Sequence, residues 1–258
     1  MPRFAANLSL MFTEQPPLAR PAAAAQAGFR AIEVQFPYDM PCGDFAHACR
    51  KAGVEAVLIN FPAGDAAKGD RGLGALPTRR DEFRAGIETA KRYLAATGAK
   101  RVNLLAGIPG PDIEPARARA TLVENIRFAA DAVADLGVTV CVEAINTRDV
   151  PGFFASGSDQ VVALIDDSGA RNAALQYDLY HMQIMEGDLI PTFARLKPRI
   201  GHIQFADTPG RHEPGTGEIN FANVFAALDR EGWDGWVAAE YRPSGRTEES
   251  LAWLPRED

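Results

Sequence analysis

The sequence predicts a single (β/α)8 barrel, and three observations support this prediction. The length of 258 residues is close to the roughly 250 typical of the fold. Eight short apolar runs alternate with helical stretches, an order that indicates a parallel sheet of the size that closes on itself. No linker, low-complexity tract or repeat of fixed period divides the sequence, so residues 1–258 are expected to form one TIM-barrel domain.

The element boundaries follow from hydrophobic periodicity and stop signals. Strands are expected at 3–7, 30–35, 54–60, 101–106, 138–143, 173–178, 200–205 and 236–241. Helices are expected at about 17–28, 43–52, 79–97, 115–136, 158–168, 188–197 and 221–231, with a shorter segment near 247–254. The clearest helix contains apolar residues at helical spacing, namely Leu122, Ile126, Ala129 and Val133. Gly137 gives its stop signal.

Alternation along the later strands predicts which side chains face the barrel axis. Small or polar residues share one parity: Thr139, Cys141 and Glu143, then Ala174, Gln176 and Asp178, then His202 and Gln204. The intervening apolar residues share the other parity. In a closed barrel the apolar parity would face the helices and the small or polar parity would face inward.

Composition and charge narrow the class of protein. The net charge of −7 argues against sequence-independent binding of nucleic acid, because such binding needs a basic face. Three cysteines without CxxC spacing suit a reducing cytosol and predict neither a disulfide framework nor a cysteine zinc site. The sequence has no secretory h-region and no apolar run of membrane-spanning length. We therefore expect a cytoplasmic protein without a membrane partner.

Four expected strands end in an oxygen ligand: Glu143, Asp178, Gln204 and Glu240. They are separated by 35, 26 and 36 residues, which fits one ligand for each strand–helix unit. In a parallel barrel these strand ends meet around one mouth. A single acid at such a position is often only a cap or a salt-bridge partner. Four together indicate a site for a hard divalent cation such as Mg²⁺ or Mn²⁺.

Such a site fits a small substrate with adjacent carbonyl and hydroxyl oxygens. Four protein ligands leave positions of an octahedral ion open, and a metal there would stabilise a developing enediolate. Two carboxylates on opposite sides of the substrate would act as acid and base. Arg211 is a candidate clamp for a substrate carboxylate because a guanidinium forms bidentate pairs, and the alternative for it is a surface arginine.

A long Gly-rich stretch at 61–78 is expected between the third and fourth strands. Loops of this length in compact domains are often lids or binding loops, and the alternative is a solvated surface loop. The stretch carries Arg71, a second candidate for the substrate carboxylate that the sequence does not rank against Arg211. Other polar residues are expected to line the pocket or support its ligands: Asn7, Glu33, Asn60, Asn103 and His202.

The most specific motifs are QYDLYHMQ and HEPGTGEIN, and they occur together with RFAANLSLMF, GFRAIEVQFPYD, VEAIN followed by PGF, GHIQFAD and AAEYRPSGRTEE. In this order and spacing the sequence resembles the hydroxypyruvate isomerase family, which belongs to the xylose-isomerase-like TIM barrels. The resemblance covers nearly the whole chain.

The resemblance implies a role for each strand-end residue. Glu143 and Glu240 match the family's pair of proton-transferring glutamates, which also bind the metal. Asp178 and Gln204 match the two remaining ligands, and His181 matches a donor to a substrate oxygen. Sugar epimerase relatives usually have histidine at the position of Gln204, so the resemblance leaves open whether the metal is obligatory. Relatives also imply a homo-oligomer.

We therefore expect an isomerase that interconverts hydroxypyruvate and tartronate semialdehyde through an enediolate, with two glutamates as acid and base. Which glutamate acts first stays open. An isomerase of four-carbon 2-oxo acids such as 2-oxotetronate is the closest alternative, because one extra hydroxymethylene is a small difference for a pocket to encode. A ketose 3-epimerase is less favoured, since Gln204 stands where histidine is expected.

Two alternatives come from other classes of protein. An endonuclease-IV-like DNA repair enzyme would need a His-rich multi-zinc site and a basic face, and the sequence has four histidines and a net charge of −7. A binding protein that has the barrel but no catalytic activity would have no reason to keep both Glu143 and Glu240. The sequence thus favours an enzyme acting on a small hydroxy or oxo acid.

Overall fold

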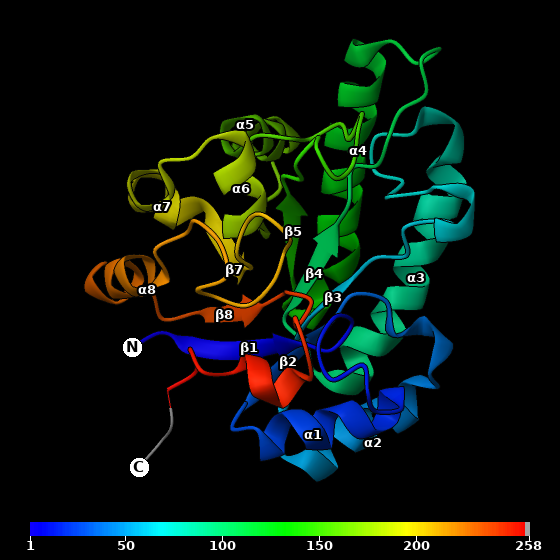
Figure 1. Cartoon of the computed structure of the whole chain (residues 1–258). Coiled ribbons are helices and arrows are strands. Elements are labelled where there is room, and N and C mark those ends of the chain that lie inside the picture. The colour runs from blue at the N-terminus through cyan, green and yellow to red at the C-terminus, as the bar shows by residue number, and fades with distance from the viewer. Residues whose placement is uncertain (256–258) are drawn as a thin grey trace.

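Eight parallel strands close into one barrel in the computed structural model, which describes residues 1–255. The strands are β1 (Arg3–Asn7), β2 (Ala31–Val34), β3 (Glu55–Asn60), β4 (Arg101–Leu104), β5 (Thr139–Glu143), β6 (Ala173–Asp178), β7 (Ile200–Phe205) and β8 (Trp236–Ala239). Each strand pairs with its neighbours in sequence order, and β8 closes the barrel against β1 (Figure 1). The predicted (β/α)8 barrel is therefore confirmed.

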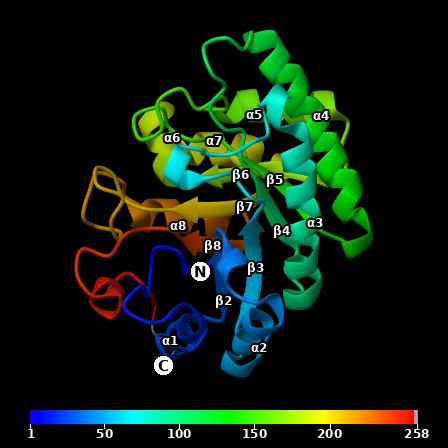
Figure 2. The same ribbon diagram turned by 90° about the vertical axis from the view of Figure 1, so that its right-hand side faces the viewer.

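Helices cover the outside of the barrel. They are α1 (Arg20–Gln26), α2 (Cys42–Ala52), α3 (Arg80–Thr97), α4 (Pro115–Val133), α5 (Ser158–Ser168), α6 (Leu179–Met185), α7 (Leu189–Leu196) and α8 (Phe221–Arg230). From α1 to α5 each helix packs against the next, so the helical layer follows the strands around the barrel (Figures 1 and 2). Within residues 1–255, no helix has both the length and the apolar character needed to cross a membrane.

Most predicted boundaries agree with the structure to within one or two residues, and α6 is the main difference. This seven-residue helix follows β6 directly and was not predicted. The side chain of Asp178 caps it by accepting a hydrogen bond from the backbone N–H of Tyr180 at 2.8 Å. A helix this short has no extended apolar periodicity, so the cap and the packing against the barrel define it.

The helix predicted most clearly, α4, forms as expected. Its apolar stripe is fully buried at Leu122, Ile126, Ala129 and Val133. A short 3-10 turn at Ala134–Leu136 extends the helix to Gly137, whose φ of 62° gives the left-handed stop that glycine adopts without steric cost.

The predicted alternation of side chains is also confirmed. Small residues from different strands, including Ala5, Cys141 and Ala238, pack together in a separate cluster inside the barrel. The opposite parity, including Val140 and Tyr177, packs into the larger cluster beneath the helices. Strand ends with inward parity therefore point to the axis at the mouth of the barrel, where the polar residues gather.

We expect Leu122→Ala to lower the free energy of unfolding by about 2–5 kcal/mol, because it removes buried methyl groups and leaves a cavity between α4 and the barrel. Urea denaturation followed by circular dichroism measures the change. The matched control is Asp131→Ala on the exposed face of the same helix, which should stay within about 0.5 kcal/mol of the wild type. Equal losses in the two variants would contradict the buried stripe.

Candidate active site

A cavity of about 1540 Å³ opens at the carboxyl ends of the strands. The polar residues considered below that line it are Gln35, Arg71, Glu143, Asp149, Tyr180, His181, Arg211 and Glu240. The carboxyl end of a parallel barrel is where strand-end side chains from every unit can meet. Four of the residues predicted for the site, Glu143, His181, Arg211 and Glu240, line this cavity, and their roles remain predictions.

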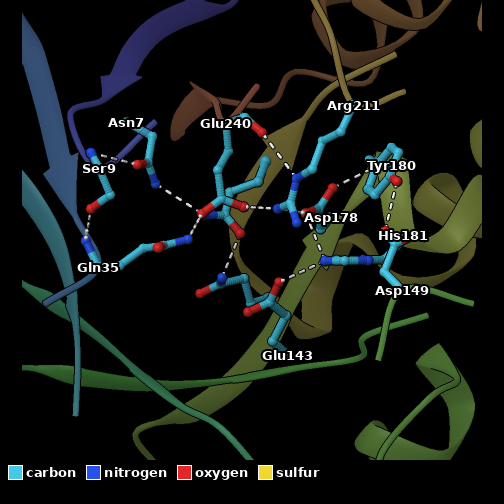
Figure 3. A network of polar contacts seen from close by, with 12 residues as sticks. Asn7, Ser9, Gln35, Glu143, Asp149, Asp178, Tyr180, His181, Arg211 and Glu240 are labelled. Carbon is cyan, nitrogen blue, oxygen red and sulfur yellow. Dashed lines mark hydrogen bonds and ion pairs between the residues drawn. The ribbon is translucent and has the colours of Figure 1, made fainter. Parts of the chain in front are cut away.

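Glu143, Asp178 and His181 lie together at the centre of the site. One ligand atom from each residue lies within 4.8 Å of the others, and all three side chains are buried. Glu143 ends β5 and Asp178 ends β6, while His181 lies on the first turn of α6 (Figure 3). Asp178 uses Oδ1 to cap α6, so its buried Oδ2 remains without a hydrogen bond. This oxygen is available to a cation or a ligand.

Asn146 fixes the proton on the ring of His181. The backbone N–H of Asn146 lies 3.3 Å from Nδ1 of the histidine, and a backbone N–H can only donate. The side-chain Nδ2 of Asn146 also lies 2.7 Å from Nδ1. Its orientation is set because Asn146 Oδ1 accepts a hydrogen bond from the backbone N–H of Asp149 at 2.7 Å. Nδ1 is therefore an acceptor, and the ring proton lies on Nε2.

Nε2 of His181 faces the two carboxylates. It lies 3.6 Å from Glu143 Oε1 and 3.5 Å from Asp178 Oδ2. Burial, together with the nearby positive charge of Arg211, lowers the pKa of His181 well below its ordinary value. The ring is therefore neutral, and Nε2–H is a hydrogen-bond donor at the cavity wall.

Glu240 lies on the other side of the cavity, immediately after β8. Its backbone N–H donates to the carbonyl of Phe205 at 2.9 Å, which continues the strand pairing to the ligand position. Its Oε1 accepts hydrogen bonds from Asn7 at 2.8 Å and from Gln35 at 2.7 Å. Its Oε2 accepts from Arg211 at 2.5 Å (Figure 3). Donors from the first two strand–loop units, Asn7 and Gln35, thus hold Glu240 in place.

Gln204 belongs to a buried polar floor beneath the carboxylates. Its Nε2 donates to Glu33 Oε1 at 2.7 Å, and its Oε1 accepts from Gln176 at 2.5 Å. His202 contacts Glu33 Oε2 at 2.6 Å, and Asn7 donates to Glu33 Oε1 at 2.8 Å. These contacts link Gln204 to the floor, and its predicted role as a metal ligand remains a prediction.

The two predicted carboxylate clamps occupy different places. The guanidinium of Arg211 lies among the carboxylates, with Nη2 at 2.5 Å from Glu240 and 3.5 Å from Asp178. Arg71 is exposed on the 61–78 loop at the rim of the cavity, where it donates to the carbonyl of Asp70 at 2.7 Å. The structure therefore places Arg211 in the centre of the site and Arg71 at its entrance.

Burial changes the acidity of the central carboxyl groups. Burial and the charges of Glu240 and Asp178 raise the pKa of Glu143 well above its ordinary value. Burial raises the pKa of Glu240 to about 8, although Arg211 opposes the shift. Burial also raises the pKa of Asp178. Buried glutamates whose pKa values lie above the ordinary value suit acid–base chemistry.

The donor set fits a divalent cation. Glu143 and Asp178 bring carboxylate oxygens within 4.8 Å of one another, Glu240 lines the same cavity as Glu143, and the buried Oδ2 of Asp178 has no hydrogen-bond partner. Carboxylate oxygens are the ligands that Mg²⁺ and Mn²⁺ prefer. Such an ion would be held by Glu143 and Asp178, and Glu240 and Gln204 remain its predicted further ligands.

Sequence reasoning missed several residues that build the site. Asn146, Asp149, Tyr180 and Gln35 were not singled out, yet they orient His181 or contact the charged groups. The hydroxyl of Tyr180 donates to Asp149 at 2.6 Å, and Gln35 donates to Glu240. Their sequence signal was position, since each lies within six residues of an expected strand end, and Gln35, Asn146 and Tyr180 also fall inside the quoted motifs.

Comparison with known proteins assigns the chain to a family. Residues 21–257 match the model of the xylose isomerase-like TIM barrel. The chain belongs to the xylose isomerase-like TIM barrel family. Within it, the chain is 44% identical over 254 residues to "Hydroxypyruvate isomerase" from Escherichia coli, with 98% of each chain covered. It is 46% identical over 254 residues to "2-oxo-tetronate isomerase" from Cupriavidus necator, again with 98% of each covered. This member of the family is therefore an isomerase.

Solved structures agree on the xylose isomerase-like fold. "AP endonuclease, family 2" from Brucella melitensis superposes with a TM-score of 0.96 at 42% identity, covering 98% of both chains. A 3-keto-D-glucoside 4-epimerase from E. coli superposes with a TM-score of 0.82 at 18% identity, covering 98% of this chain and 99% of the other, which shows the fold alone. Within residues 1–255, the cluster suited to a metal contains one histidine, unlike the His-rich site expected of an endonuclease.

The raised pKa of Glu240 predicts how the stability of the metal-free protein depends on pH. Between about pH 4.5 and pH 8 the folded protein retains a proton that the unfolded chain releases. Stability from this group is therefore complete below pH 4.5 and is lost as the pH rises to 8, by at most about 1.4 kcal/mol per pH unit. Denaturation across this range should show a smaller decline for Glu240→Gln. An identical decline in both proteins would contradict the shift.

Proposed function

We propose that the protein interconverts hydroxypyruvate and tartronate semialdehyde by moving a proton between adjacent carbons. The observation that carries the proposal is the pair of buried glutamates, Glu143 and Glu240, with raised pKa values on two sides of one cavity. Full-length similarity to two isomerases of short 2-oxo acids supports the same reaction class. Carboxyl groups whose pKa lies near the working pH are effective in proton transfer.

In the forward direction one ionised glutamate removes a proton from the hydroxymethyl carbon. The electron pair of that C–H bond forms the carbon–carbon double bond of an enediolate as the carbonyl electron pair moves onto its oxygen. A proton then returns to the neighbouring carbon, and the proton of the original hydroxyl oxygen passes to the original carbonyl oxygen, so that the carbonyl and hydroxyl groups exchange places. Glu143 and Glu240 supply and accept these protons, and the order in which they act stays open. Burial strengthens both as bases, because a carboxylate of higher pKa binds a proton more tightly.

The remaining groups hold the substrate during proton transfer. His181 presents its Nε2–H to a substrate oxygen, and its neutral ring donates without adding charge. Arg211 supplies a guanidinium for the substrate carboxylate, with Arg71 at the entrance as the second candidate. A divalent ion such as Mg²⁺ or Mn²⁺, when bound by Glu143, Asp178, Gln204 and Glu240, supplies positive charge that stabilises a developing oxyanion.

The four-carbon 2-oxotetronate is the second candidate substrate. The chain is 46% identical to an isomerase named for that substrate and 44% identical to one named for hydroxypyruvate. A cavity of about 1540 Å³ has room for either acid. The choice between them depends on the fit of one hydroxymethylene group, which is worth about 1–3 kcal/mol.

We expect Glu143→Gln and Glu240→Gln each to lower kcat by about 100- to 10,000-fold, because an amide cannot exchange the proton. An isomerisation assay measures the loss, and circular dichroism verifies that the fold is retained. The control is Glu55→Gln, an exposed position where β3 begins at the opposite end of the barrel, and it should leave turnover unchanged. Near-normal turnover in both active-site variants would refute the proposed mechanism.

Substrate and metal can be tested in one series of assays. We expect metal-stripped protein to be inactive and Mg²⁺ or Mn²⁺ to restore isomerisation, with a higher kcat/KM for hydroxypyruvate than for 2-oxotetronate. A preference for the four-carbon acid would retain the mechanism and move the assignment to the second candidate. Full activity after metal removal would contradict the predicted cofactor, and no turnover of either acid would contradict the proposed reaction.

A further inference from the structure

The side chain of Arg211 occupies the space between the two halves of the carboxylate site. Its Nη2 lies 2.5 Å from Glu240 Oε2 and 3.5 Å from Asp178 Oδ2, and its Nε donates to the Glu240 carbonyl at 3.3 Å. Its guanidinium carbon lies 5.0 Å from the centre of the Tyr180 ring (Figure 3). A positive charge therefore already contacts two of the proposed metal ligands.

The backbone around Arg211 is fixed, so its position is not that of a loose surface side chain. Arg211 has a φ of 60°, a region that residues other than glycine rarely adopt. The loop is held by the buried carboxylate of Asp207, which accepts hydrogen bonds from the backbone N–H groups of Thr208, Gly215, Gly217 and Ile219. The carbonyl of Arg211 also accepts from the backbone N–H of Arg242 at 2.8 Å. Because the loop backbone is held in this way, the guanidinium of Arg211 can change its contacts by rotation of the side chain.

The same carboxylate oxygens of Asp178 and Glu240 would bind either the guanidinium of Arg211 or a divalent ion. Asp178 Oδ2 has no hydrogen bond, and its closest cationic contact is Arg211 Nη2. Glu240 Oε2 is the acceptor in the shortest contact of the Arg211 side chain, at 2.5 Å. A divalent ion held by these oxygens would place two like charges within a few ångströms in a buried site, where repulsion is weakly screened.

We propose that Arg211 and the divalent ion compete for the carboxylates of Asp178 and Glu240. Binding of the ion releases the guanidinium into the cavity, where it takes the carboxylate of the substrate. This inference rests on the proposed function for its metal and its acidic substrate. Because coupling between two ligands is reciprocal, a carboxylate that pairs with Arg211 increases the affinity for the ion.

Direct titration of Mn²⁺ into the full-length protein tests the competition without measuring turnover. We expect Arg211→Met to bind Mn²⁺ at least about tenfold more tightly than the wild type, because the competing charge is gone. Arg211→Lys retains a charge and should bind Mn²⁺ closer to the wild-type affinity. Equal or weaker binding by Arg211→Met would overturn the competition. If the wild type binds no Mn²⁺, the metal of the proposed function fails together with this inference.

A second titration of Mn²⁺ is made in the presence of propionate, which has a carboxylate but no neighbouring oxygen that could chelate the ion. Saturating propionate should raise the Mn²⁺ affinity of the wild type severalfold and leave Arg211→Met unchanged. An equal increase in both proteins would mean that the anion binds the ion directly, and it would overturn the role of Arg211.

A measurement on the wild type alone covers the case in which the variants do not fold. The Nε–H of Arg211 donates to a carbonyl and should exchange slowly with solvent. Mg²⁺ should accelerate this exchange in nuclear magnetic resonance spectra. Exchange that stays slow at saturating Mg²⁺ would show that both cations bind together, against the proposal.

Discussion

Burial of negative charge at the mouth of the barrel is the constraint on which the site depends. Glu33, Glu143, Asp178 and Glu240 are all nearly or fully inaccessible to water. An unpaired buried carboxylate costs several kcal/mol, so each needs donors close by. Those donors come from separate parts of the barrel, for example the Asn103 amide on β4, which donates to Glu143 at 2.6 Å. The fold and the charge distribution are therefore tied together by the same contacts.

The site divides its positive and neutral donors between two sides. His181 is kept neutral and correctly protonated by Asn146, so it can donate to an oxygen without attracting a proton from a glutamate. Arg211 provides full charge next to Glu240, whose carboxylate it stabilises against the effect of burial. A neutral donor near Glu143 and a cation near Glu240 give the two glutamates different surroundings. Different surroundings of this kind would let two chemically identical residues perform different steps of the proposed reaction.

Much of this arrangement could be predicted from the sequence because strand periodicity fixes direction. The alternation of side chains pointed Glu143 and Asp178 toward the axis, and the closed barrel brought them together as expected. Contacts between side chains could not be predicted in the same way. Gln204 shares the inward parity but pairs with Glu33 and Gln176, since its amide meets an acceptor from β2 across the barrel and a donor from the adjacent β6. The spacing of residues along the chain does not predict which side chains form hydrogen bonds with one another.

The contact between Asn7 and Glu240 joins residues 233 positions apart in the sequence. Synthesis on the ribosome proceeds from the first of these residues to the second, so a growing chain acquires Glu143 and Asp178 long before it acquires their counterpart. An unfinished chain contains Glu143 and Asp178 but not Glu240, and its barrel is not closed. The nascent polypeptide therefore lacks one of the two glutamates proposed to transfer protons until the residue after β8 has been synthesised, and the barrel closes only when β8 pairs with β1.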